Sequence, residues 1–307
     1  MDGQRVIGVD LGGTKILAGL VGRDGAIERR RERPTPVTSQ DDLLEALEAA
    51  VAELLDDRVV ALGFGVPSTV DQRSGTAVSS VNIPLAGLEL RSRMRERFGL
   101  PVGVDNDANA AAIAEWSVGA GRGAQHMVML TLGTGIGGGL ILDGRPYRGA
   151  VGAAAELGHI VIEHDGRPCQ GHCTGRGHLE GYTTGKAAGE AAQEVFGPGV
   201  DSHRLVRLAN EGDPRAAEIL TAIGRRLGSA LGSFVNVFNP EVIVVGGGFA
   251  AAGDWLFGPA REVMLREALP PGRDLVRVVR AELGTAAGLV GAALVGFEAL
   301  DTAAAPA

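Results

Sequence analysis

Near the start of the chain lies the stretch Val6-Ile7-Gly8-Val9-Asp10-Leu11-Gly12-Gly13-Thr14-Lys15. A stretch of the same pattern lies about one domain further along the chain: Met127-Val128-Met129-Leu130-Thr131-Leu132-Gly133-Thr134-Gly135-Ile136-Gly137-Gly138-Gly139. In each stretch a short apolar run, typical of a buried strand, leads into a glycine-rich loop, and another β-rich run follows, at 16–21 and 140–142. Glycine lets backbone N–H groups approach an anion closely, and the adjacent threonine adds a hydroxyl donor. We therefore predict two β-hairpins whose tips clamp a polyphosphate between two lobes.

The second loop contains the spacing G-x-G-x-x-G, from Gly133 to Gly138, but its context argues against a dinucleotide site. Such a site needs a helix that begins at the last glycine. Here Leu140-Ile141-Leu142-Asp143-Gly144 follows, which indicates a strand and a tight turn. The segment Gly181–Lys186 is not a Walker loop either, because it is one residue too short and no Ser or Thr follows the lysine. Two ordinary glycine turns remain the alternative interpretation.

The bulk composition indicates two globular domains. The 307 residues suit two domains of about 150 residues each, and the apolar content of 45% is ample for two cores. The net charge of −8 and the lack of a long basic patch argue against nucleic acid and anionic membranes as partners. Because Met1 leads almost directly into a core strand and no apolar run reaches the length of a membrane span, we expect neither a signal peptide nor an anchor, and a cytosolic location.

The element order is expected to be β-β-β-α-β-α-β-α, repeated twice. In the first half, strands are expected within 5–33, at 59–64 and at 101–105, and helices after a Ser39–Asp42 capping box, at 88–98 and at 108–118. The first of these helices should bury one face, formed by Leu43, Leu44, Leu47, Val51, Leu54 and Leu55.

In the second half, strands are expected near 126–132, 138–143, 159–163, 241–245 and 275–280, and helices near 179–195, 203–210, 214–238, 254–268 and 285–300. The repeat predicts two similar α/β lobes with a cleft between them, where ligands usually bind. Residues 1–117 plus 288–307 should form a small lobe, and 118–287 a large one.

The segment Asp105-Asn106-Asp107-Ala108-Asn109 lies between an expected strand and an expected helix. In open α/β sheets ligands bind at this end of the strands. A carboxylate at Asp107 could accept a proton from a substrate hydroxyl, although capping the helix would also justify an aspartate there. Asp10, before the first loop, could orient water around the Mg²⁺ that accompanies a nucleoside triphosphate.

Other polar residues gather in loops. Asn82, Glu156, His159 and Glu180 would make a polar pocket suited to many hydroxyls, for which a sugar is the obvious ligand. Both cysteines, Cys169 and Cys173, lie in 159–178 with four of the six histidines. With His159 and His178 they would supply the four ligands of a structural zinc ion, His164 and His172 being reserves. A polar loop with two free thiols is the alternative.

In these motifs the chain resembles the ROK family (repressors, open reading frames, kinases), and within it the bacterial glucokinase-like sugar kinases. The two glycine-rich loops match the family's phosphate motifs, and Val245-Gly246-Gly247-Gly248 resembles its adenosine motif. Asp105-Asn106-Asp107 resembles the catalytic segment, and Glu156-Leu157-Gly158-His159 the sugar-binding signature. The resemblance implies an actin-like ATPase fold (ribonuclease H-like, hexokinase-type) with two α/β lobes that close on substrate.

The resemblance also implies roles for these residues. Asp107 would be the base that activates the 6-hydroxyl of a hexose, most simply glucose. The other hydroxyls would be held by Asn82, Asn106, Glu156, His159 and Glu180. ATP with Mg²⁺ would bind at Asp10, Gly12, Gly13, Thr14, Lys15, Gly133, Thr134, Gly135, Gly246, Gly247 and Gly248. The family suggests a homodimer or homotetramer.

The sequence departs from the family pattern at two positions. His178 stands where the zinc segment usually has Cys, so a site of the His₂Cys₂ type is expected, and Ser68 stands where Gly is more common. Several alternatives remain open at this point. The sugar could be N-acetylmannosamine, N-acetylglucosamine, mannose or fructose, and the donor could be polyphosphate. The chain could also be a sugar-sensing repressor, disfavoured because Asp10 lies so near the start, or an ATPase without a small substrate.

Overall fold

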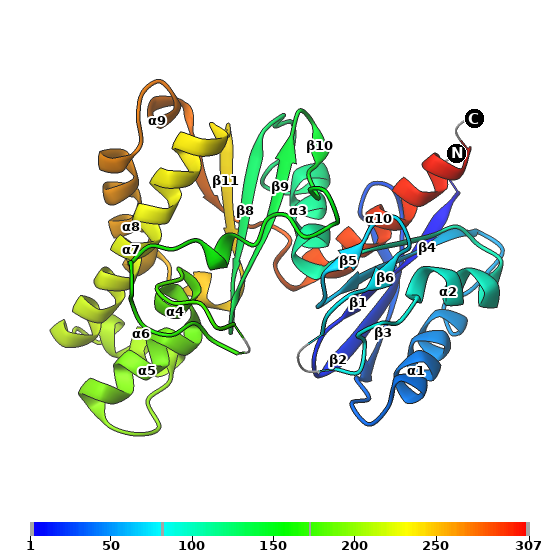
Figure 1. The fold of residues 1–307 in the computed structure, drawn as a ribbon, viewed down its shortest axis with the longest axis horizontal. Helices are drawn as coiled ribbons and strands as arrows, with labels where there is room; N and C mark the ends of the chain where they lie inside the picture. The colour runs from blue at the N-terminus through cyan, green and yellow to red at the C-terminus, as the bar shows by residue number, and fades with distance from the viewer. Residues whose placement is uncertain (1–2, 81–82, 172, 305–307) are drawn as a thin grey trace. The chain divides into compact units, whose positions relative to one another are not determined.

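The computed structural model describes residues 3–80, 83–171 and 173–304, and it divides into two compact units. The first comprises Met1–Arg122, Pro146–Ala155 and Thr285–Ala307, and the second Gly123–Arg145 and Glu156–Gly284. Each unit has its own five-stranded sheet, with helices packed against it (Figure 1). The division differs from the expected one chiefly at Pro146–Ala155. The sequence predicts that this segment belongs to the large lobe, but it packs within the first unit.

The sheet of the first unit begins as the sequence predicted, with three antiparallel strands: β1 (Arg5–Leu11), β2 (Lys15–Val21) and β3 (Ile27–Pro34). Strands β4 (Val59–Val66) and β7 (Val102–Asn106) continue it in parallel, in the order β3-β2-β1-β4-β7. The carboxyl ends of β1, β4 and β7 therefore meet at one edge, where the first loop and the 105–107 segment lie. A small ribbon of β5 (Val70–Asp71) and β6 (Thr76–Ala77) follows β4.

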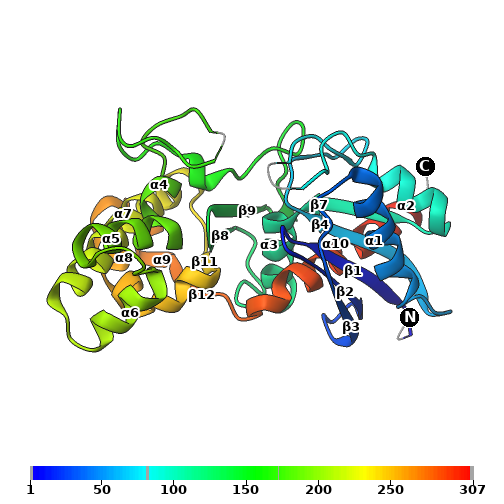
Figure 2. The same ribbon diagram turned by 90° about the horizontal axis from the view of Figure 1, so that it is seen from below.

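Helices cover both faces of this sheet (Figures 1 and 2). On one face α1 (Gln40–Ala52) buries Leu43 and Leu47 in a cluster that includes alternate residues of β1. The Ser39 hydroxyl caps α1 by accepting the N–H of Asp42, as predicted. The prediction for Leu55 is wrong, because the residue lies beyond the end of α1 and is 45% exposed. The other helices of the unit are α2 (Leu90–Phe98), α3 (Asp107–Val118) and α10 (Ala287–Ala304).

Helix α10 lies directly against the backbone of the sheet, and glycines make this possible. A Cβ on Gly63 in β4 would lie 1.8 Å from the carbonyl oxygen of Ala292, and one on Gly103 in β7 would lie 2.3 Å from that of Val295. No side chain fits in such a gap, so each glycine is required by packing rather than by its backbone angles. The contact ties the last helix of the chain to the first sheet.

The same helix corrects the expectation that no apolar run is long enough to cross a membrane. Residues Gly284–Ala304 form a helical stretch that passes a test of length and composition for a span, with a mean hydropathy of 1.4. Half of that stretch is buried inside the structure, and Leu289, Ala293 and Phe297 pack in a cluster with the sheet. Its apolar composition is accounted for by this packing.

The sheet of the second unit repeats the topology of the first. Its strands are β8 (Met127–Leu132), β9 (Ile136–Leu142), β10 (Arg145–Pro146), β11 (Val242–Gly246) and β12 (Arg277–Arg280). Their order, β10-β9-β8-β11-β12, matches that of the first sheet strand for strand. The antiparallel pairing of β8 with β9 and the parallel pairings of β8 with β11 and of β11 with β12 recur in the same places as in the first sheet, which confirms the duplicated β-β-β-α-β-α-β-α frame.

One strand of this sheet was predicted in the wrong place. The third strand is Arg145–Pro146, not 159–163, where the chain forms a 3₁₀ turn at Leu157–His159 and a single bridge from Val161 to His178. Gly158 packs on β9, where a Cβ would lie 2.7 Å from the carbonyl oxygen of Ile136. Residues 159–163 therefore take no part in the sheet, and they are half-buried or exposed, with Val161 60% exposed. Their β-rich composition is a local propensity that the fold does not use for sheet pairing.

The remaining helices belong to the second unit: α4 (Glu180–Thr183), α5 (Gly185–Phe196), α6 (Ser202–Asn210), α7 (Pro214–Phe238), α8 (Asp254–Glu267) and α9 (Gly272–Leu275). Helix α7 has the predicted bounds, with an Asp213 cap and Pro214 in its first turn. Figure 1 shows α7 and α8 side by side. They approach closely at Gly228, where a Cβ would lie 2.4 Å from the carbonyl oxygen of Ala260.

We predict that Gly63→Ala destabilises the protein by about 3 kcal/mol, because the methyl group overlaps the backbone of α10. The matched control is Gly189→Ala in the interior of α5, where the new Cβ would meet its neighbours at 3.6 to 3.9 Å, an ordinary contact distance. The control should be neutral or stabilising by roughly 0.5–1 kcal/mol, since alanine favours the helix. Urea unfolding measures both, and equal stability of the two variants would contradict the packing described.

Candidate active site

The first glycine-rich loop is a tight hairpin tip between β1 and β2. The N–H of Gly12 donates to the carbonyl oxygen of Lys15 at 2.9 Å, and the hydroxyl of Thr35 donates to the carbonyl oxygen of Gly12 at 2.7 Å. At Gly13 a Cβ would have no neighbour within 4 Å. That glycine is therefore not explained by packing, and it leaves open space beside the tip for a ligand.

Two charged residues flank the tip. The carboxyl group of Asp10 is largely buried beside the start of α10, since a Cβ on Gly288 would lie 2.3 Å from Asp10 Oδ2. Burial raises the pKa of Asp10, and the nearby Lys15 ammonium group opposes the rise. Lys15 also pairs with Glu32 on β3 at 3.1 Å, a bridge that is half exposed. Asp10 thus offers the oxygens of a desolvated carboxyl group as ligands, and a bound cation would stabilise its charged form.

The 105–107 segment corrects the expected helix cap. The cap of α3 is Asn106, whose Oδ1 accepts the N–H of Ala108 at 2.9 Å and of Asn109 at 3.2 Å. Asp107 is the first residue of the helix, partly exposed, with its Oδ1 also accepting the N–H of Ala108 at 2.9 Å. Since Asn106 provides the cap, capping alone no longer accounts for an aspartate at 107.

Ser68 lies beside this segment. It is 5% exposed, and its hydroxyl donates to the carbonyl oxygen of Thr69 at 2.8 Å, within its own turn. The carbonyl oxygen of Ser68 accepts the side-chain amide of Asn106 at 3.4 Å. Ser68 therefore supports Asn106 through its backbone. Asn82, which was expected to bind a sugar hydroxyl, lies outside the described residues.

The other expected sugar residues lie in the second unit. Glu156 and His159 flank the 3₁₀ turn, with His159 Nδ1 3.3 Å from Glu156 Oε2. Glu180 begins α4 and is engaged with the second glycine-rich loop: its Oε2 accepts the N–H of Ile136 at 2.8 Å. Of its two carboxylate oxygens, one is therefore committed to the loop, which the sequence did not reveal.

The second loop is supported from several sides. Gly133 donates its N–H to the carbonyl oxygen of Gly135 at 2.9 Å, and its own carbonyl oxygen accepts the N–H of Gly185 at the start of α5, at 3.0 Å. Gly247 has a φ of +86°, and a Cβ there would lie 2.3 Å from the carbonyl oxygen of Leu132. This part of the adenosine-like motif thus packs against the base of the loop and holds its backbone in one conformation.

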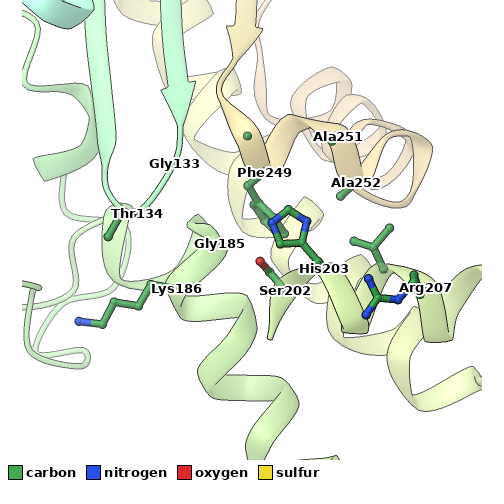
Figure 3. A pocket seen from close by; sticks show the side chains of 12 residues that line it. Gly133, Thr134, Gly185, Lys186, Ser202, His203, Arg207, Phe249, Ala251 and Ala252 are labelled. Atoms are coloured by element: carbon green, nitrogen blue, oxygen red, sulfur yellow. The ribbon is translucent and has the colours of Figure 1, made fainter. Parts of the chain in front are cut away.

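A cavity of about 510 Å³ opens beside the loop, within the second unit (Figure 3). Its glycine-rich rim is formed by Gly133 and Thr134 at the hairpin tip and by Gly185 at the N-terminus of α5. Figure 3 shows Ser202 and His203 next to Phe249. The lining comprises Gly133, Thr134, Gly185, Lys186, Ser202, His203, Val206, Arg207, Gly248, Phe249, Ala251 and Ala252.

The chemistry of this lining changes from one part to another. Backbone N–H groups of a glycine loop and a helix N-terminus, together with Lys186, suit phosphate. Apolar side chains such as Phe249 and Val206 suit a flat base, and hydroxyl and imidazole groups suit a ribose. Sequence analysis missed the residues from α5 and α6, because only the tertiary fold brings the starts of these helices to the loop. The pattern Gly181–Lys186, which does not fit a Walker loop, gave no indication that Lys186 lines this cavity.

Two glycines at the cavity are not required by the backbone conformation or by packing. Gly248 lines the cavity, and a Cβ there would have no neighbour within 4 Å. At Gly133 the nearest atom to such a Cβ would be 3.8 Å away. These two glycines are required neither by packing nor by a positive φ, in contrast to Gly247. Their missing side chains leave room for a ligand.

The four predicted metal ligands do come together. One donor atom from each of His159, Cys169, Cys173 and His178 lies within 4.8 Å of the others. Cys173 Sγ is 3.6 Å from His178 Nδ1, and the two imidazole rings lie edge to face with centroids 5.3 Å apart. Of the reserves, His164 has a side chain that is 94% exposed, and His172 lies outside the described residues. Two thiols and two imidazoles fit a tetrahedral zinc ion.

One of the two thiols, that of Cys169, holds its proton firmly when no cation is bound. Burial and the neighbouring Cys173 raise the pKa of Cys169 to about 11. Both cysteines are free, so no disulfide competes for them. A bound metal would displace the thiol protons, which makes metal uptake dependent on pH.

The cluster is connected to the second loop by hydrogen bonds. Gln170, next to Cys169, donates its side-chain amide to the carbonyl oxygen of Glu180 and to the hydroxyl of Thr184, each at 3.0 Å. Cys169 Sγ lies 4.0 Å from Glu180 Oε1. The loop that carries the candidate metal ligands therefore also holds Glu180 and the start of α5, which in turn hold the glycine-rich loop.

The ROK family model matches residues 6–297 of the chain. The chain belongs to the ROK family. It is 35% identical to a glucokinase of Thermotoga maritima over 306 residues, which cover 94% of this chain and 96% of that one. It is 32% identical to an N-acetyl-D-glucosamine kinase of Shigella boydii over 305 residues, 93% and 97% of the two chains.

Among solved structures, the chain is similar to a ROK family glucokinase from Streptomyces griseus in complex with glucose and AMPPNP. The TM-score is 0.81 at 35% identity, and the match covers 96% of this chain and 99% of that one. Together with the duplicated sheets, this similarity confirms the predicted actin-like ATPase fold. The glycine-rich hairpins β1–β2 and β8–β9 occupy equivalent places in the two sheets, and the Gly247 turn follows β11, which corresponds to β4.

We predict that Gly248→Ala leaves the protein folded but weakens binding of the nucleotide analogue AMPPNP about tenfold, because the methyl group enters the cavity. Its neighbour gives the matched comparison. Gly247→Ala should lower the melting temperature by several degrees, since the new Cβ overlaps Leu132 and the positive φ becomes strained. Thermal unfolding and calorimetric titration separate the two effects, and a Gly248→Ala variant with unchanged affinity would contradict the proposed use of the cavity.

Proposed function

We propose that this protein transfers the γ-phosphoryl group of ATP to the 6-hydroxyl of a hexose, with glucose as the preferred substrate. The observation that carries the proposal is the cavity of about 510 Å³ beside the second glycine-rich loop, whose lining joins a glycine-rich hairpin tip to apolar side chains such as Phe249 and Val206. The similarity to glucokinases over nearly the whole chain supports the sugar and the reaction. Its location would be the cytosol, and the protein would be a homodimer or homotetramer.

In the proposed reaction Asp107 is the base. The 6-oxygen of the sugar attacks the γ-phosphorus, the bond from that phosphorus to the β,γ-bridging oxygen breaks, and ADP leaves. The proton of the sugar hydroxyl passes to the Asp107 carboxylate. Because the transition state is loose, positioning contributes more than base strength, and the first turn of a capped helix is a rigid support.

The remaining residues would bind the substrates. Asn106 and Asn82 from the first unit, and Glu156, His159 and Glu180 from the second, would hold the other hydroxyls. Of these, Glu180 would have only one carboxylate oxygen available, since the other accepts the N–H of Ile136. The first loop, from Gly12 to Lys15, and the Gly133–Gly135 and Gly246–Gly248 segments would bind ATP.

Magnesium and zinc would serve different purposes. Mg²⁺ on the triphosphate would neutralise charge on the transferred group, and the desolvated oxygens of Asp10 suit its water shell. Zn²⁺ would be structural and would be held by His159, Cys169, Cys173 and His178. A zinc ion there would fix the orientation of His159 next to the sugar signature.

We predict that Asp107→Asn abolishes turnover, with kcat reduced by about 10³-fold or more, while the dissociation constant for the sugar changes less than about threefold. Asparagine keeps the size of the side chain and one oxygen that can accept the N–H of Ala108, but it cannot take the proton. Coupled detection of ADP gives kcat, and calorimetric titration of the sugar gives its affinity. A variant that loses sugar binding but keeps its turnover per bound sugar would contradict the role as a base.

A panel of sugars discriminates between the candidate substrates. Glucose should give the highest kcat/KM, ahead of mannose, fructose, N-acetylglucosamine and N-acetylmannosamine. The similarity to an N-acetyl-D-glucosamine kinase makes N-acetylhexosamines the alternative. A preference for an N-acetylhexosamine would favour that alternative, and ADP release that no sugar accelerates would favour an ATPase without a small substrate. Replacing ATP with polyphosphate tests the second donor.

We predict about one zinc ion per chain by elemental analysis, and its loss in His178→Ala. The matched control is His164→Ala, which removes a histidine of the same loop whose side chain is 94% exposed. The control should retain the metal, because it takes no part in the cluster. Wild-type protein that is free of metal yet fully folded and active would refute the site.

A further inference from the structure

Asp105, two residues before Asp107, is a buried carboxylate with 1% exposure. Its Oδ1 accepts the N–H of Asn106 at 2.8 Å and the side-chain amide of Asn109 at 3.1 Å. Its Oδ2 accepts Arg148 Nε at 2.6 Å. One oxygen thus holds the helix cap and the other holds a cation, so the carboxylate joins Arg148 to the first turn of α3.

Arg148 supplies the positive charge that lies directly against this carboxylate. Burial raises the pKa of Asp105, and the Arg148 guanidinium acts against the rise. The other two nitrogens of Arg148 bind the Glu298 carboxylate on α10, at 3.0 and 2.6 Å. Arg91 also faces Asp105, but its guanidinium donates to the carbonyl oxygen of Gln72 at 2.9 Å. Arg148 therefore makes the direct ion pair with Asp105.

The segment that carries Arg148 is itself fixed to the first unit. Pro146–Ala155 leaves the second unit after β10 and packs within the first. Gly152 in this segment has a φ of +84°, and a Cβ there would lie 1.9 Å from the carbonyl oxygen of Val70. Such a close backbone contact fixes the segment beside the β5–β6 ribbon independently of the arginine. Arg148 therefore projects from a fixed support, as a positioning group requires.

We propose that Arg148 is a positioning residue for phosphoryl transfer, acting through Asp105 and Asn106 on Asp107. The chain of contacts is continuous: Arg148 holds Asp105, Asp105 holds the Asn106 N–H and the Asn109 side chain, and Asn106 caps the helix that begins with Asp107. Small displacements of a reacting group cost about 10²-fold in rate. The inference rests on the proposed role of Asp107, and it adds a residue that no motif of the sequence pointed to.

A purely structural role for Arg148 is the competing explanation, and variants separate the two. Arg148→Met keeps the apolar stem and removes the charge. We expect kcat of the folded protein to fall by about 10- to 100-fold, with the KM for ATP and sugar within about threefold of wild type. Arg148→Lys keeps a cation near Asp105 and should recover part of kcat.

The matched control is Arg58→Met, because Arg58 also bridges two carboxylates, Glu28 and Asp56, each at 3.0 Å. Its side chain is 47% exposed, against 17% for Arg148. The control removes an arginine of the same unit with the same number of acidic partners, so its kcat should remain that of wild type. Asp105→Asn combined with Arg148→Met should be less impaired than the sum of the single changes, since neither charge is then left alone.

Chemical rescue provides a second test. A cavity of about 340 Å³ borders Arg148 and Glu298, and truncation in Arg148→Ala would enlarge it. Guanidinium or ethylguanidinium ions at low millimolar concentration, far below denaturing levels, should enter and restore at least tenfold of the lost kcat. The controls are potassium chloride at equal ionic strength, the wild-type protein and Asp107→Asn, none of which should respond.

These measurements also separate the inference from the function on which it rests. Wild-type kcat in Arg148→Met, or a loss confined to thermal stability with no rescue by guanidinium, would overturn the positioning role and leave Asp107 untouched. Full activity of Asp107→Asn would instead overturn the proposed base, whatever the arginine variants show. Equal losses of kcat in Arg148→Met and Arg58→Met would also count against a specific path through Asp105.

Discussion

The backbone of the second glycine-rich loop is constrained by a close packing contact and by hydrogen bonds from the segments next to it. Gly247 approaches the base of the loop so closely that any side chain would overlap Leu132. Gly185 donates its N–H to the carbonyl oxygen of Gly133, and the Glu180 carboxylate accepts the N–H of Ile136. These contacts place the loop, the start of α5 and the candidate metal loop in one connected structure. These contacts fix the backbone on both sides of Thr134, and in the proposed function the nucleotide site depends on this arrangement.

The duplicated frame uses the same hairpin twice but supports it differently. In the first unit the tip is held by Thr35 and bordered by the Lys15–Glu32 bridge, and the last helix packs against the sheet through glycines such as Gly63. In the second unit a long insertion after β10 brings in the His and Cys residues. The common strand order thus provides two equivalent sheet edges, and the chemistry comes from what each half adds at its edge.

Much of this could be predicted because it is local. The hairpins, the repeated element order and the grouping of His159, Cys169, Cys173 and His178 follow from patterns along the chain, and the described residues agree with them. The predictions that were wrong or missing concern contacts between distant parts of the chain, or a choice between neighbouring residues of similar propensity. Asn106 and Asp107 are adjacent good caps, so sequence could not choose between them. The cavity wall from α5 and α6, and the arginine that crosses from Pro146–Ala155 to Asp105, depend on tertiary packing that no periodicity encodes.

In the proposed function ATP would bind at the second loop, and the sugar would bind to Asp107 and to the Glu156–His159 turn. Hydrogen exchange followed by mass spectrometry tests this assignment most directly, because each ligand should slow exchange in its own segments. Mg²⁺ with AMPPNP should protect 133–136, 185–186 and 248–252, and glucose should protect 105–109 and 156–159. Protection by AMPPNP elsewhere in the chain, with exchange in these loops unchanged, would contradict the assignment of the nucleotide to the second glycine-rich loop.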